Sequence, residues 1–503
     1  MTPTAQQATY VEALLTTSNH TALIARAGCG KTSTILLGVQ AILKATPRAE
    51  IVVAAYNKAI ADEVGEKLKV MGLTDWRQVQ ASTMHSLGFG LLRFAFKPTI
   101  DDKKVRKLVD QRNDDISAQY STQIISLVGY AKQAGVGFFP DSPIGNVQVW
   151  HDLADHFDVN GLDDTSEADA VVEAAQAVYR ASLAQTDIID FDDMILFPLI
   201  KNMRVRFGKD HIFLDEAQDA SRVRQALARK FLKPGGRLHV VGDDRQAIYG
   251  FSGADAAALD NLVREMGCAV YPLNVTWRCP KAVVALAQTI VPDIEAAPSA
   301  PEGEVSSVSG KEAIDALVAG LGPTDAVLCR NTAPLIELAF RLIRQGKPCK
   351  VEGRAIGDGL INLAQRWKVK TIDAFLGRLE AYQDREMQKA LAKGSEAKAQ
   401  EVEDRCETLR TIAQACVSAN KTQVSDIVAY INELFADGAT GVTVLATAHR
   451  SKGREWPRVV LWGNNRYAPS RAAKQAWQQS QEQNLIYVMF TRAQRELVFV
   501  DLP

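Results

Sequence analysis

The run Ala25-Arg-Ala-Gly-Cys-Gly-Lys-Thr32 places two glycines, a lysine and a threonine at a spacing that suits phosphate chemistry. The glycines let backbone N–H groups turn toward phosphate oxygens, Lys31 can reach the β- and γ-phosphates, and the Thr32 hydroxyl can hold Mg²⁺. An apolar run predicts a strand over 21–25, and a helix is expected from about Ser33. The predicted phosphate-binding residues are Ala27, Gly28, Cys29, Gly30, Lys31, Thr32 and Ser33.

Two adjacent carboxylates follow another apolar run, in Phe213-Leu-Asp-Glu-Ala-Gln-Asp219. Asp215 ends the predicted strand, where its carboxylate can join the shell of a Mg²⁺ ion. Glu216 is placed to act as the general base for an attacking water. Guanine is not the expected base, because Asn57-Lys58 is followed by Ile60 where the guanine-reading signal of GTPases has aspartate. The two segments together predict a hydrolase of a nucleoside triphosphate.

The elements that would hold these groups are short apolar runs that alternate with helical stretches. Such runs indicate parallel strands whose sheet is covered on both faces. The runs of the first half are 21–25, 51–55, 212–214 and 238–241; a second series begins near residue 305 and contains 326–329, 442–445, 459–462 and 497–500. Two segments interrupt the alternation, 97–180 and 356–440, and both are interpreted as helical insertions.

Composition sets outer limits on the protein. A length of 503 residues suffices for roughly three domains. The net charge of −1 means that any nucleic-acid contact must come from a local groove. Seven scattered cysteines, never spaced CxxC, argue against a disulfide framework or a zinc site. No apolar stretch reaches the roughly 18 residues of a membrane span, and no signal-peptide pattern opens the chain, so we predict a soluble cytoplasmic protein.

Further motifs follow the first two in chain order. They are Val241-Gly-Asp-Asp-Arg-Gln-Ala-Ile-Tyr-Gly-Phe-Ser-Gly-Ala254, Leu273-Asn-Val-Thr-Trp-Arg-Cys-Pro280, Ala446-Thr-Ala-His-Arg-Ser-Lys-Gly-Arg-Glu-Trp456 and Glu482-Gln-Asn-Leu-Ile-Tyr-Val-Met-Phe-Thr-Arg-Ala493. With the phosphate loop and the acidic segment, they resemble the ordered motifs of superfamily-one DNA helicases of the UvrD/Rep/PcrA type.

This resemblance implies an α/β fold with two RecA-like parallel-sheet P-loop motor domains, each with a mainly helical insertion. The first motor domain is expected in 1–96 and 181–275, with its insertion in 97–180. The second is expected in 276–355 and 441–503, with a reduced insertion in 356–440. ATP and Mg²⁺ would bind in the cleft between the motor domains.

The family's catalytic roles carry over to matching residues. Thr32 and Asp215 would hold the metal, Gln246 would sense the γ-phosphate and the attacking water, and two arginines would contact the γ-phosphate. The implied catalytic residues are Lys31, Asp215, Glu216, Gln246, Arg278 and Arg492.

The resemblance also implies the contacts to the adenosine. Gln6 would read adenine, with the adjacent Gln7 as the alternative, and Trp277 would stack on the base. Glu455 would bond the ribose, and Gly453 would lie against the nucleotide.

A second set of residues matches family motifs that face nucleic acid. Single-strand binding needs aromatic faces for bases and donors for phosphates. An aromatic residue after a strand can equally belong to the core, and a histidine can equally be structural, so both interpretations stay open for this set. Its members are Tyr56, Asn57, Thr83, His85, Tyr249, Phe251, Arg330, Thr447 and His449.

The sequence departs from the family pattern at several positions. Ser252 stands where the third motif usually has an arginine that is linked with coupling ATP to DNA. Arg26 stands where the phosphate loop usually has glycine, and it fits only if its side chain leaves the loop. Arg454 replaces leucine in the fifth motif. None of these changes removes a catalytic residue, so we expect an active ATPase.

We therefore expect a DNA-stimulated ATP hydrolase that moves along single-stranded DNA, 3′ to 5′ by resemblance, and unwinds duplex at single-strand/double-strand junctions. One alternative is a translocase that displaces proteins from DNA and unwinds weakly, which the reduced second insertion would suit. Another is a non-motor ATP-gated clamp whose altered third motif no longer couples turnover to movement. The residues alone identify neither the direction of movement nor the protein partners.

Overall fold

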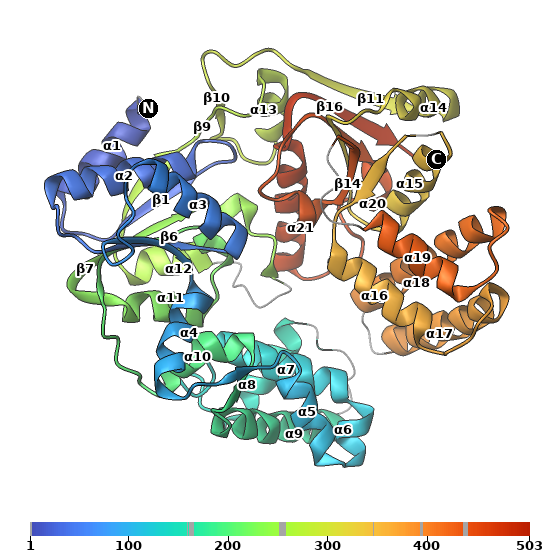
Figure 1. The fold of residues 1–503 in the computed structure, drawn as a ribbon, viewed down its shortest axis with the longest axis horizontal. Coiled ribbons are helices and arrows are strands. Elements are labelled where there is room, and N and C mark those ends of the chain that lie inside the picture. Colours follow the sequence, from blue (N-terminus) through green and yellow to red (C-terminus); the bar gives the residue numbers. More distant parts are fainter. Residues whose placement is uncertain are drawn as a thin grey trace. The chain divides into compact units, whose positions relative to one another are not determined.

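The computed structural model describes residues 3–157, 159, 165–250, 258–345, 347–392, 396–435 and 441–502. The chain forms two compact units, Met1–Asn274 and Val275–Pro503. Each unit contains a six-stranded sheet in which every pair of neighbouring strands is parallel (Figure 1). This confirms the predicted fold class of two parallel-sheet α/β domains.

The first sheet has the strand order β3-β2-β6-β7-β1-β8. Alternate residues point to opposite faces, so Leu23 and Val53 pack in one core while Ala22 and Val52 pack in the other. Burial on both faces explains the continuous apolar runs in the central strands. The strands are β1 (Thr21–Ala25), β2 (Ile51–Ala55), β3 (Val79–Thr83), β6 (Lys209–Leu214), β7 (Leu232–Gly242) and β8 (Ala269–Leu273).

Helices cover both faces of this sheet (Figure 1). The core that contains Leu23 and Val53 also takes residues of α1, α2 and α3, and the opposite core takes residues of α4, α10, α11 and α12. These helices are α1 (Ala5–Thr16), α2 (Lys31–Ala45), α3 (Lys58–Val70), α4 (Met84–Ala95), α10 (Phe191–Ile200), α11 (Arg222–Lys230) and α12 (Ala258–Glu265).

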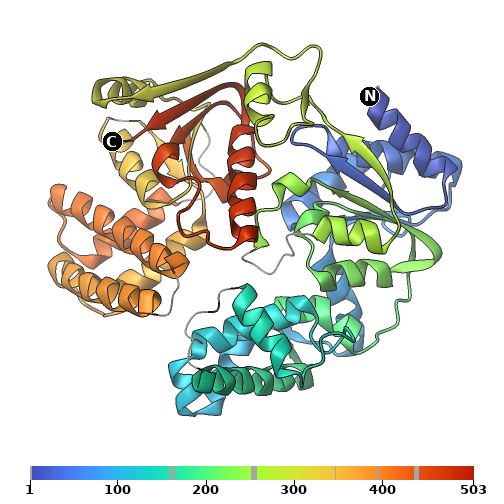
Figure 2. The same ribbon diagram turned by 180° about the vertical axis from the view of Figure 1, so that it is seen from behind.

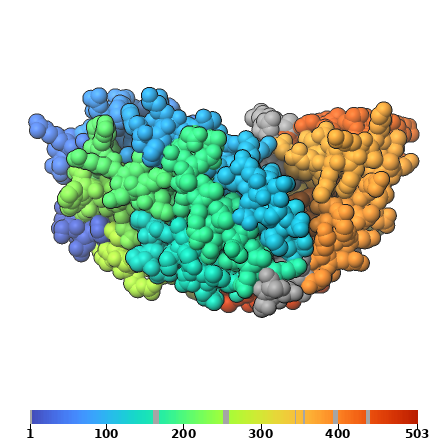
Figure 3. Space-filling view, turned by 90° about the horizontal axis from the view of Figure 1, so that it is seen from below, coloured from blue at the N-terminus to red at the C-terminus, as the bar shows by residue number. Residues whose placement is uncertain are grey.

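The segment between β4 (Thr99–Ile100) and β5 (Ile188–Ile189) is helical. Its side chains, Trp150 and Val171 among them, belong to the same hydrophobic core as one face of the sheet. The insertion therefore folds as a continuation of the first unit, and its helices form an outer surface there (Figure 3). The helices are α5 (Lys104–Arg112), α6 (Asp115–Gln119), α7 (Ser121–Ala134), α8 (Val147–His156) and α9 (Thr165–Ala184).

The second sheet has the order β11-β16-β15-β12-β14-β13. Its strands are β11 (Glu304–Ser309), β12 (Asp325–Cys329), β13 (Cys349–Val351), β14 (Thr443–Thr447), β15 (Trp456–Trp462) and β16 (Ala493–Asp501), and the short pair β9 (Val275–Thr276) and β10 (Glu295–Ala296) stands apart. The helices that accompany it are α13 (Lys281–Ala287), α14 (Lys311–Gly320), α15 (Ala333–Arg344), α20 (Asn464–Tyr467) and α21 (Ala476–Phe490).

The segment between β13 and β14 is the second helical insertion, which lies to one side of its sheet in both ribbon views (Figures 1 and 2). Phe375 and Leu409 of this segment share a core with Val327 and Val460 of the sheet. The helices are α16 (Arg354–Gln365), α17 (Ile372–Ala392), α18 (Glu396–Ser418) and α19 (Val424–Leu434).

Within the two six-stranded sheets, four strands were not evident in the apolar pattern, and all four are edge strands: β3, β8, β11 and β13. Their residues are largely half-buried or exposed, as in Val79-Gln-Ala-Ser-Thr83 and Glu304-Val-Ser-Ser-Val-Ser309. An edge strand has a neighbour on one side only and needs no continuous apolar run. Among the described residues, the helices are too short or too polar to cross a membrane.

A buried ion cluster joins the first insertion to α10. The Lys104 ammonium lies 2.7 Å from one Asp193 carboxylate oxygen, and the Lys132 ammonium lies 2.7 Å from the other. Lys132 also lies 2.5 Å from Asp190, which caps α10. Since the side chains of Lys104, Lys132 and Asp193 are inaccessible to solvent, each charge depends on its partners.

Replacing Asp193 by asparagine should lower the free energy of unfolding by about 3–5 kcal/mol, because two buried ammonium groups lose their shared carboxylate. Urea unfolding of the variant measures this change. Asp62→Asn is the matched control: Asp62 pairs with Lys58 at 2.7 Å, but both side chains are exposed, so little change is expected. Equal effects at the two sites would contradict the assigned role of the cluster.

A chain of hydrogen bonds also runs through the interior of the first unit. Tyr10 and Thr21 share a bond of 3.2 Å, Thr21 bonds His239 Nδ1 at 2.9 Å, and His239 Nε2 lies 3.0 Å from His211 Nδ1. Burial lowers the pKa of His211 to about 4, with a smaller contribution from Arg237. Burial also holds the pKa of the inaccessible His239 well below its ordinary value. Both rings are therefore neutral in the folded protein at neutral pH.

The folded protein should lose stability as pH falls below about 6.5, because the unfolded chain then binds protons that folded His239 does not. Between pH 7 and pH 5 this residue alone should cost about 2 kcal/mol. Urea unfolding at both pH values should show a weaker pH dependence for His239→Gln. His156→Gln, at an exposed position, should leave it intact; a wild-type pH dependence in His239→Gln would refute this assignment.

Candidate active site

The carboxyl ends of all parallel strands meet at one edge of a sheet, and the first unit's predicted site residues follow these ends. In the strand order of the sheet, the edge carries His85 beyond β3, Tyr56 after β2, Glu216 after β6, Gln246 after β7 and Lys31 after β1. His85 and Tyr56, two of the residues expected to face nucleic acid, thus lie toward one end of the edge, and the phosphate loop lies toward the other.

The loop between β1 and α2 has the backbone that a phosphate site requires. Gly28 and Gly30 have φ values of 72° and 85°, which residues with a Cβ rarely adopt. A tight turn closes where the Cys29 N–H donates to the Arg26 carbonyl at 3.3 Å. The N-terminus of α2 begins at Lys31, so its first N–H groups and the positive end of its dipole border the loop.

The carboxylates after β6 face the loop lysine. Lys31 Nζ lies 2.6 Å from Glu216 Oε1. Burial would lower the pKa of Lys31, but the carboxylates of Glu216, Asp215 and Asp243 reverse this and raise it. Glu216 has φ +50°, an unfavourable backbone conformation for a non-glycine residue that often marks functional sites. In this conformation Lys31 is paired with the proposed general base, so a triphosphate would have to replace that partner.

The groups around Lys31 fit a Mg²⁺–triphosphate better than an all-protein metal site. The described residues contain no group of three or more His, Cys, Asp or Glu that could enclose a metal. Mg²⁺ typically takes one or two protein oxygens together with water and substrate phosphates. The Thr32 hydroxyl and the Asp215 carboxylate are oxygen donors of this kind. Thr32 follows Lys31 in the chain, and Asp215 helps to raise the pKa of Lys31.

The turn after β7 is bonded to the acidic segment. Gln218 Nε2 donates to Glu216 Oε2 at 2.5 Å, and Gln218 Oε1 accepts from the Asp243 N–H at 3.1 Å. Gln246 Nε2 donates to Asp243 Oδ2 at 2.6 Å. Sequence reasoning had not assigned Gln218 a role. It joins the two turns on which the proposed base and the proposed phosphate sensor stand.

The structure separates the two candidate adenine readers. The Gln7 side chain is buried, accepts from the Thr4 N–H at 3.0 Å and donates to Thr34 Oγ1 at 2.9 Å, so it caps α1 and ties it to α2. Gln6 is half-buried, and its amide bonds both the side chain and, at 3.2 Å, the backbone N–H of Asn274. Gln6 as the adenine reader, with Gln7 as the alternative, stays a prediction.

In the second unit, the residues expected at the nucleotide gather at the amino edge of the sheet. Arg278 Nε donates to Glu455, which directly precedes β15, and Arg278 also donates to the Thr491 carbonyl at 3.4 Å. Arg492 directly precedes β16 and donates from NH2 to Thr491 Oγ1 at 3.1 Å. Trp277 is 55 % exposed, so its side chain is accessible for stacking.

Arg492 itself is buried in the described conformation. Its guanidinium donates to the carbonyls of Val488 at 2.8 Å and Arg454 at 3.1 Å as well as to Thr491. A γ-phosphate contact would therefore require this arginine to exchange some of its acceptors. Gly453 has φ +83°, which turns the chain just before Arg454 and Glu455.

Tyr56 and Tyr249 come together although they are distant in sequence. Their rings stack with centroids 5.8 Å apart and an interplanar angle of 12°. The Arg224 guanidinium lies 5.7 Å from the Tyr56 ring centre. Burial lowers the pKa of His85 to about 4, with a smaller effect of Arg224, so this histidine is neutral at pH 7.

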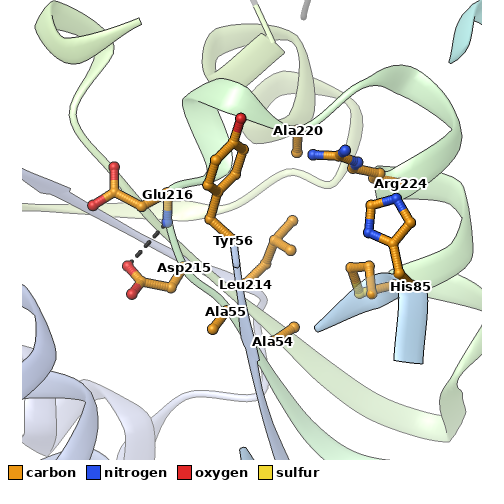
Figure 4. Close-up of a pocket in the computed structure, with 10 residues that line it drawn as sticks. Ala54, Ala55, Tyr56, His85, Leu214, Asp215, Glu216, Ala220 and Arg224 are labelled. Carbon is orange, nitrogen blue, oxygen red and sulfur yellow. Dashed lines mark hydrogen bonds between the residues drawn. The ribbon is translucent and has the colours of Figure 1, made fainter. Parts of the chain in front are cut away.

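These groups border the carboxylates that follow β6. Tyr56, His85 and Arg224 line the same cavity, of about 20 Å³, as Asp215 and Glu216 (Figure 4). A cavity of this size holds about one water. The sequence analysis did not predict Arg224. This residue could have been found as the second arginine of Ser221-Arg-Val-Arg224, at the start of the helix that follows the acidic segment. Also not predicted was Phe191, a 56 % exposed ring that contacts His85 edge-on at 6.3 Å.

Other predicted nucleic-acid residues have structural partners. Asn57 accepts from the Ile60 N–H at 2.9 Å, and Thr83 accepts from the Ser86 N–H at 3.1 Å, so both cap helices. Phe251 and Ser252 lie outside the described residues.

In the second unit the predicted nucleic-acid residues lie at the carboxyl edge, opposite the Arg278 group. Arg330, directly after β12, forms a two-pronged ion pair with Glu482 at 2.8–3.2 Å. Thr447 ends β14 and is buried, and His449 follows it. Burial and then Arg330 lower the pKa of His449 to about 3. Arg330 is thus held by Glu482 rather than offered freely to a phosphate.

Comparison with known families agrees with this geometry. The family model described as the UvrD/REP helicase N-terminal domain matches residues 4–266, more than half of the chain. The model described as the UvrD-like helicase C-terminal domain matches residues 364–501. The chain belongs to the UvrD/Rep helicase family. The predicted family resemblance is therefore confirmed.

Curated relatives are distant and longer. A probable DNA helicase II homolog of Rickettsia felis is 23 % identical over 304 residues, which are 56 % of this chain and 43 % of that protein. The ATP-dependent DNA helicase UvrD1 of Mycobacterium tuberculosis is 26 % identical over 306 residues, 54 % of this chain and 37 % of the relative. The ATP-dependent DNA helicase srs2 of Schizosaccharomyces pombe is 23 % identical over 300 residues, 54 % and 33 % of the two chains. The matched part is less than half of each relative.

The contacts of Gln6 and Gln7 predict different phenotypes. Gln6→Ala should lower the preference for ATP over GTP by about 5- to 30-fold, because about 1–2 kcal/mol of base-specific hydrogen bonding is lost. Gln7→Ala should lower the melting temperature and leave the preference unchanged. The ratio of kcat/KM for the two nucleotides and a thermal melt test both expectations; the reverse result would make Gln7 the base reader.

Proposed function

We propose that this protein is an ATP-dependent DNA helicase or translocase that moves along single-stranded DNA, 3′ to 5′, and unwinds duplex at single-strand/double-strand junctions. Family membership supports the reaction class. The direction and the junction preference extend the resemblance of the motifs. The six predicted sequence segments, from 1–96 to 441–503, are proposed as the two motor domains and their insertions.

The observation that carries the proposal is the order of residues along the carboxyl edge of the first sheet. The turn after β6 lies between the phosphate loop after β1 and Tyr56 after β2, and Tyr249, from the segment after β7, stacks on Tyr56. Glu216 contacts both regions, because it pairs with Lys31 of the phosphate loop and lines the same cavity as Tyr56. A change at the phosphates that moves Glu216 would therefore also change the surroundings of Tyr56.

The first step of the proposed cycle is an exchange of partners. ATP would take Lys31 from Glu216, which frees the carboxylate to accept a proton from the attacking water. A bound Mg²⁺, held by Thr32 and Asp215, would neutralise charge on the phosphates. Arg278 and Arg492 are the second unit's proposed contacts to the γ-phosphate, where an inserted arginine can be worth about 10³–10⁵ in rate.

The aromatic side is the proposed track for the strand. Stacking on exposed rings is worth about 1–3 kcal/mol per base and tolerates any sequence, as a translocating protein requires. Tyr56, Tyr249 and the exposed Phe191 are the proposed platforms. Arg224 is proposed to link them to the acidic segment, since it lies beside Tyr56 and lines the cavity with Glu216.

ATP hydrolysis with and without single-stranded DNA tests the proposal first. Wild type should be stimulated strongly by DNA, and Lys31→Ala should abolish turnover because it removes the phosphate contact. Lys67→Ala is the matched control: this lysine pairs with Glu63 on an exposed helix face and should behave as wild type. Duplexes with a 3′ or a 5′ single-stranded tail then test direction, with unwinding of the 3′-tailed substrate expected.

Two results would count against the motor. Slow turnover that DNA does not change would favour the ATP-gated clamp. Strong DNA stimulation without unwinding of either tailed duplex, but with displacement of a bound protein, would favour the protein-displacing translocase.

A further inference from the structure

Arg26 occupies a place in the phosphate loop where a charged side chain is costly. It follows β1 and comes two residues before Gly28, yet its side chain is only 10 % exposed. A buried guanidinium is tolerated only when acceptors surround it. The side chain leaves the loop, as the sequence required, and it turns toward the end of β7.

The acceptors of Arg26 belong to the turn after β7. Arg26 NH1 lies 2.9 Å from Asp243 Oδ1 and 2.5 Å from Asp244 Oδ1. Asp243 is inaccessible to solvent, and its second oxygen accepts from Gln246 Nε2 at 2.6 Å. One carboxylate therefore joins the arginine of the phosphate loop to the glutamine proposed to face the γ-phosphate.

We propose that Arg26 is a positioning residue for catalysis: it keeps Asp243 ionised and in place, so that the Gln246 amide presents its carbonyl end to the attacking water. The inference rests on the proposed function for the role of Gln246. The bonded chain Arg26–Asp243–Gln246 carries it.

The physical reason is the hydrogen-bonding capacity of an ionised carboxylate. A carboxylate only accepts hydrogen bonds, so the Gln246 NH₂ must face Asp243 and its carbonyl must point away. A protonated Asp243 could donate instead, and the amide could then turn over. The carbonyl is the end that can accept a hydrogen bond from a water nucleophile.

The charges around Asp243 show why an arginine is needed. Burial raises the pKa of Asp243 above its ordinary value, and Arg26, followed by Lys31, opposes this increase without cancelling it. Asp244 adds negative charge beside Asp243, and Asp215 adds negative charge beside Lys31. When Lys31 turns to a bound triphosphate, Arg26 is the cation that stays with Asp243, because its second partner, Asp244, belongs to the same turn.

Arg26→Met, which keeps much of the side-chain volume without the charge, tests the proposal through ATP hydrolysis between pH 5 and pH 9. We expect kcat to fall about 10- to 100-fold with KM for ATP nearly unchanged, because a group is misplaced rather than lost. The acid limb of the profile should move up by about one pH unit or more, since an opposite charge within a few ångströms lowers a carboxyl pKa by about 1–3 units.

Two further variants separate positioning from folding. Arg26→Lys restores the charge at a single point and should recover part of kcat. Arg26→Met/Asp243→Asn should have low activity but no shifted acid limb, because the titrating carboxyl is gone. A normal profile for Arg26→Met would overturn the proposal. A raised KM with unchanged kcat would also overturn it, because Arg26 would then contact the nucleotide itself.

A measurement that needs no turnover keeps this test independent of the proposed function. In protein labelled with [¹⁵N]glutamine, the Gln246 side-chain NH₂ signal, assigned by its loss in Gln246→Met, reports the ionisation of Asp243. Its titration midpoint should lie at higher pH in Arg26→Met than in wild type, and the titration should vanish in Asp243→Asn. Equal midpoints would overturn the inference even if ATP hydrolysis is confirmed, and shifted midpoints would support the Arg26–Asp243–Gln246 link even if it is not.

Discussion

Parallel strand pairing is the constraint on which the functional geometry depends. Because every strand of the first sheet runs the same way, every loop that follows a strand emerges at one edge. The sheet thereby brings residues as distant in sequence as Lys31, Glu216 and Gln246 into one row. The strand order then decides which of them are neighbours. It places the turn after β6 between the phosphate loop and Tyr56, on which Tyr249 from the segment after β7 stacks.

The pairing of cations with carboxylates along that edge determines which residues can exchange partners and which are fixed. Lys31 and Arg26 face the carboxylates of Asp215, Glu216, Asp243 and Asp244. The two cations are held differently. Lys31 pairs with a carboxylate that has its own proposed role in catalysis, so its partner can be exchanged when phosphates arrive. Arg26 is fixed by two aspartates of one turn and stabilises that turn. Lys31 is thus suited to exchanging its partner, and Arg26 is suited to keeping the turn after β7 in place.

The rest of the first unit keeps this edge rigid. Both faces of the sheet are covered, and the helical insertion shares the core of one face. Buried ionic groups, such as the Lys104–Asp193–Lys132 cluster, and the chain from Tyr10 to His211 cross-link helices and strands inside these cores. Such groups tolerate little displacement, because any unpaired buried charge costs several kcal/mol, roughly 3–5 for a broken pair.

Local chemistry was readable from the sequence wherever one segment carries a complete signal. The phosphate loop, the Asp215–Glu216 pair and the central strands are of this kind, since glycine spacing, adjacent carboxylates and continuous apolar runs are local properties. Edge strands such as β3 and β13 were not evident, because half-exposed strands need no apolar run. The choice between Gln6 and Gln7 also stayed open, because two adjacent residues of one helix differ only in what they face.

Tertiary structure decided the contacts between segments that are distant in the chain. Arg330 proved to be held by Glu482, 152 residues away, and Arg26 by a turn 217 residues away. The sequence could indicate that the Arg26 side chain must leave its loop, since a phosphate site has no room for it. It could not name the partner, because a buried arginine accepts any suitably placed carboxylate. Only the strand order brought Asp243 and Asp244 beside it.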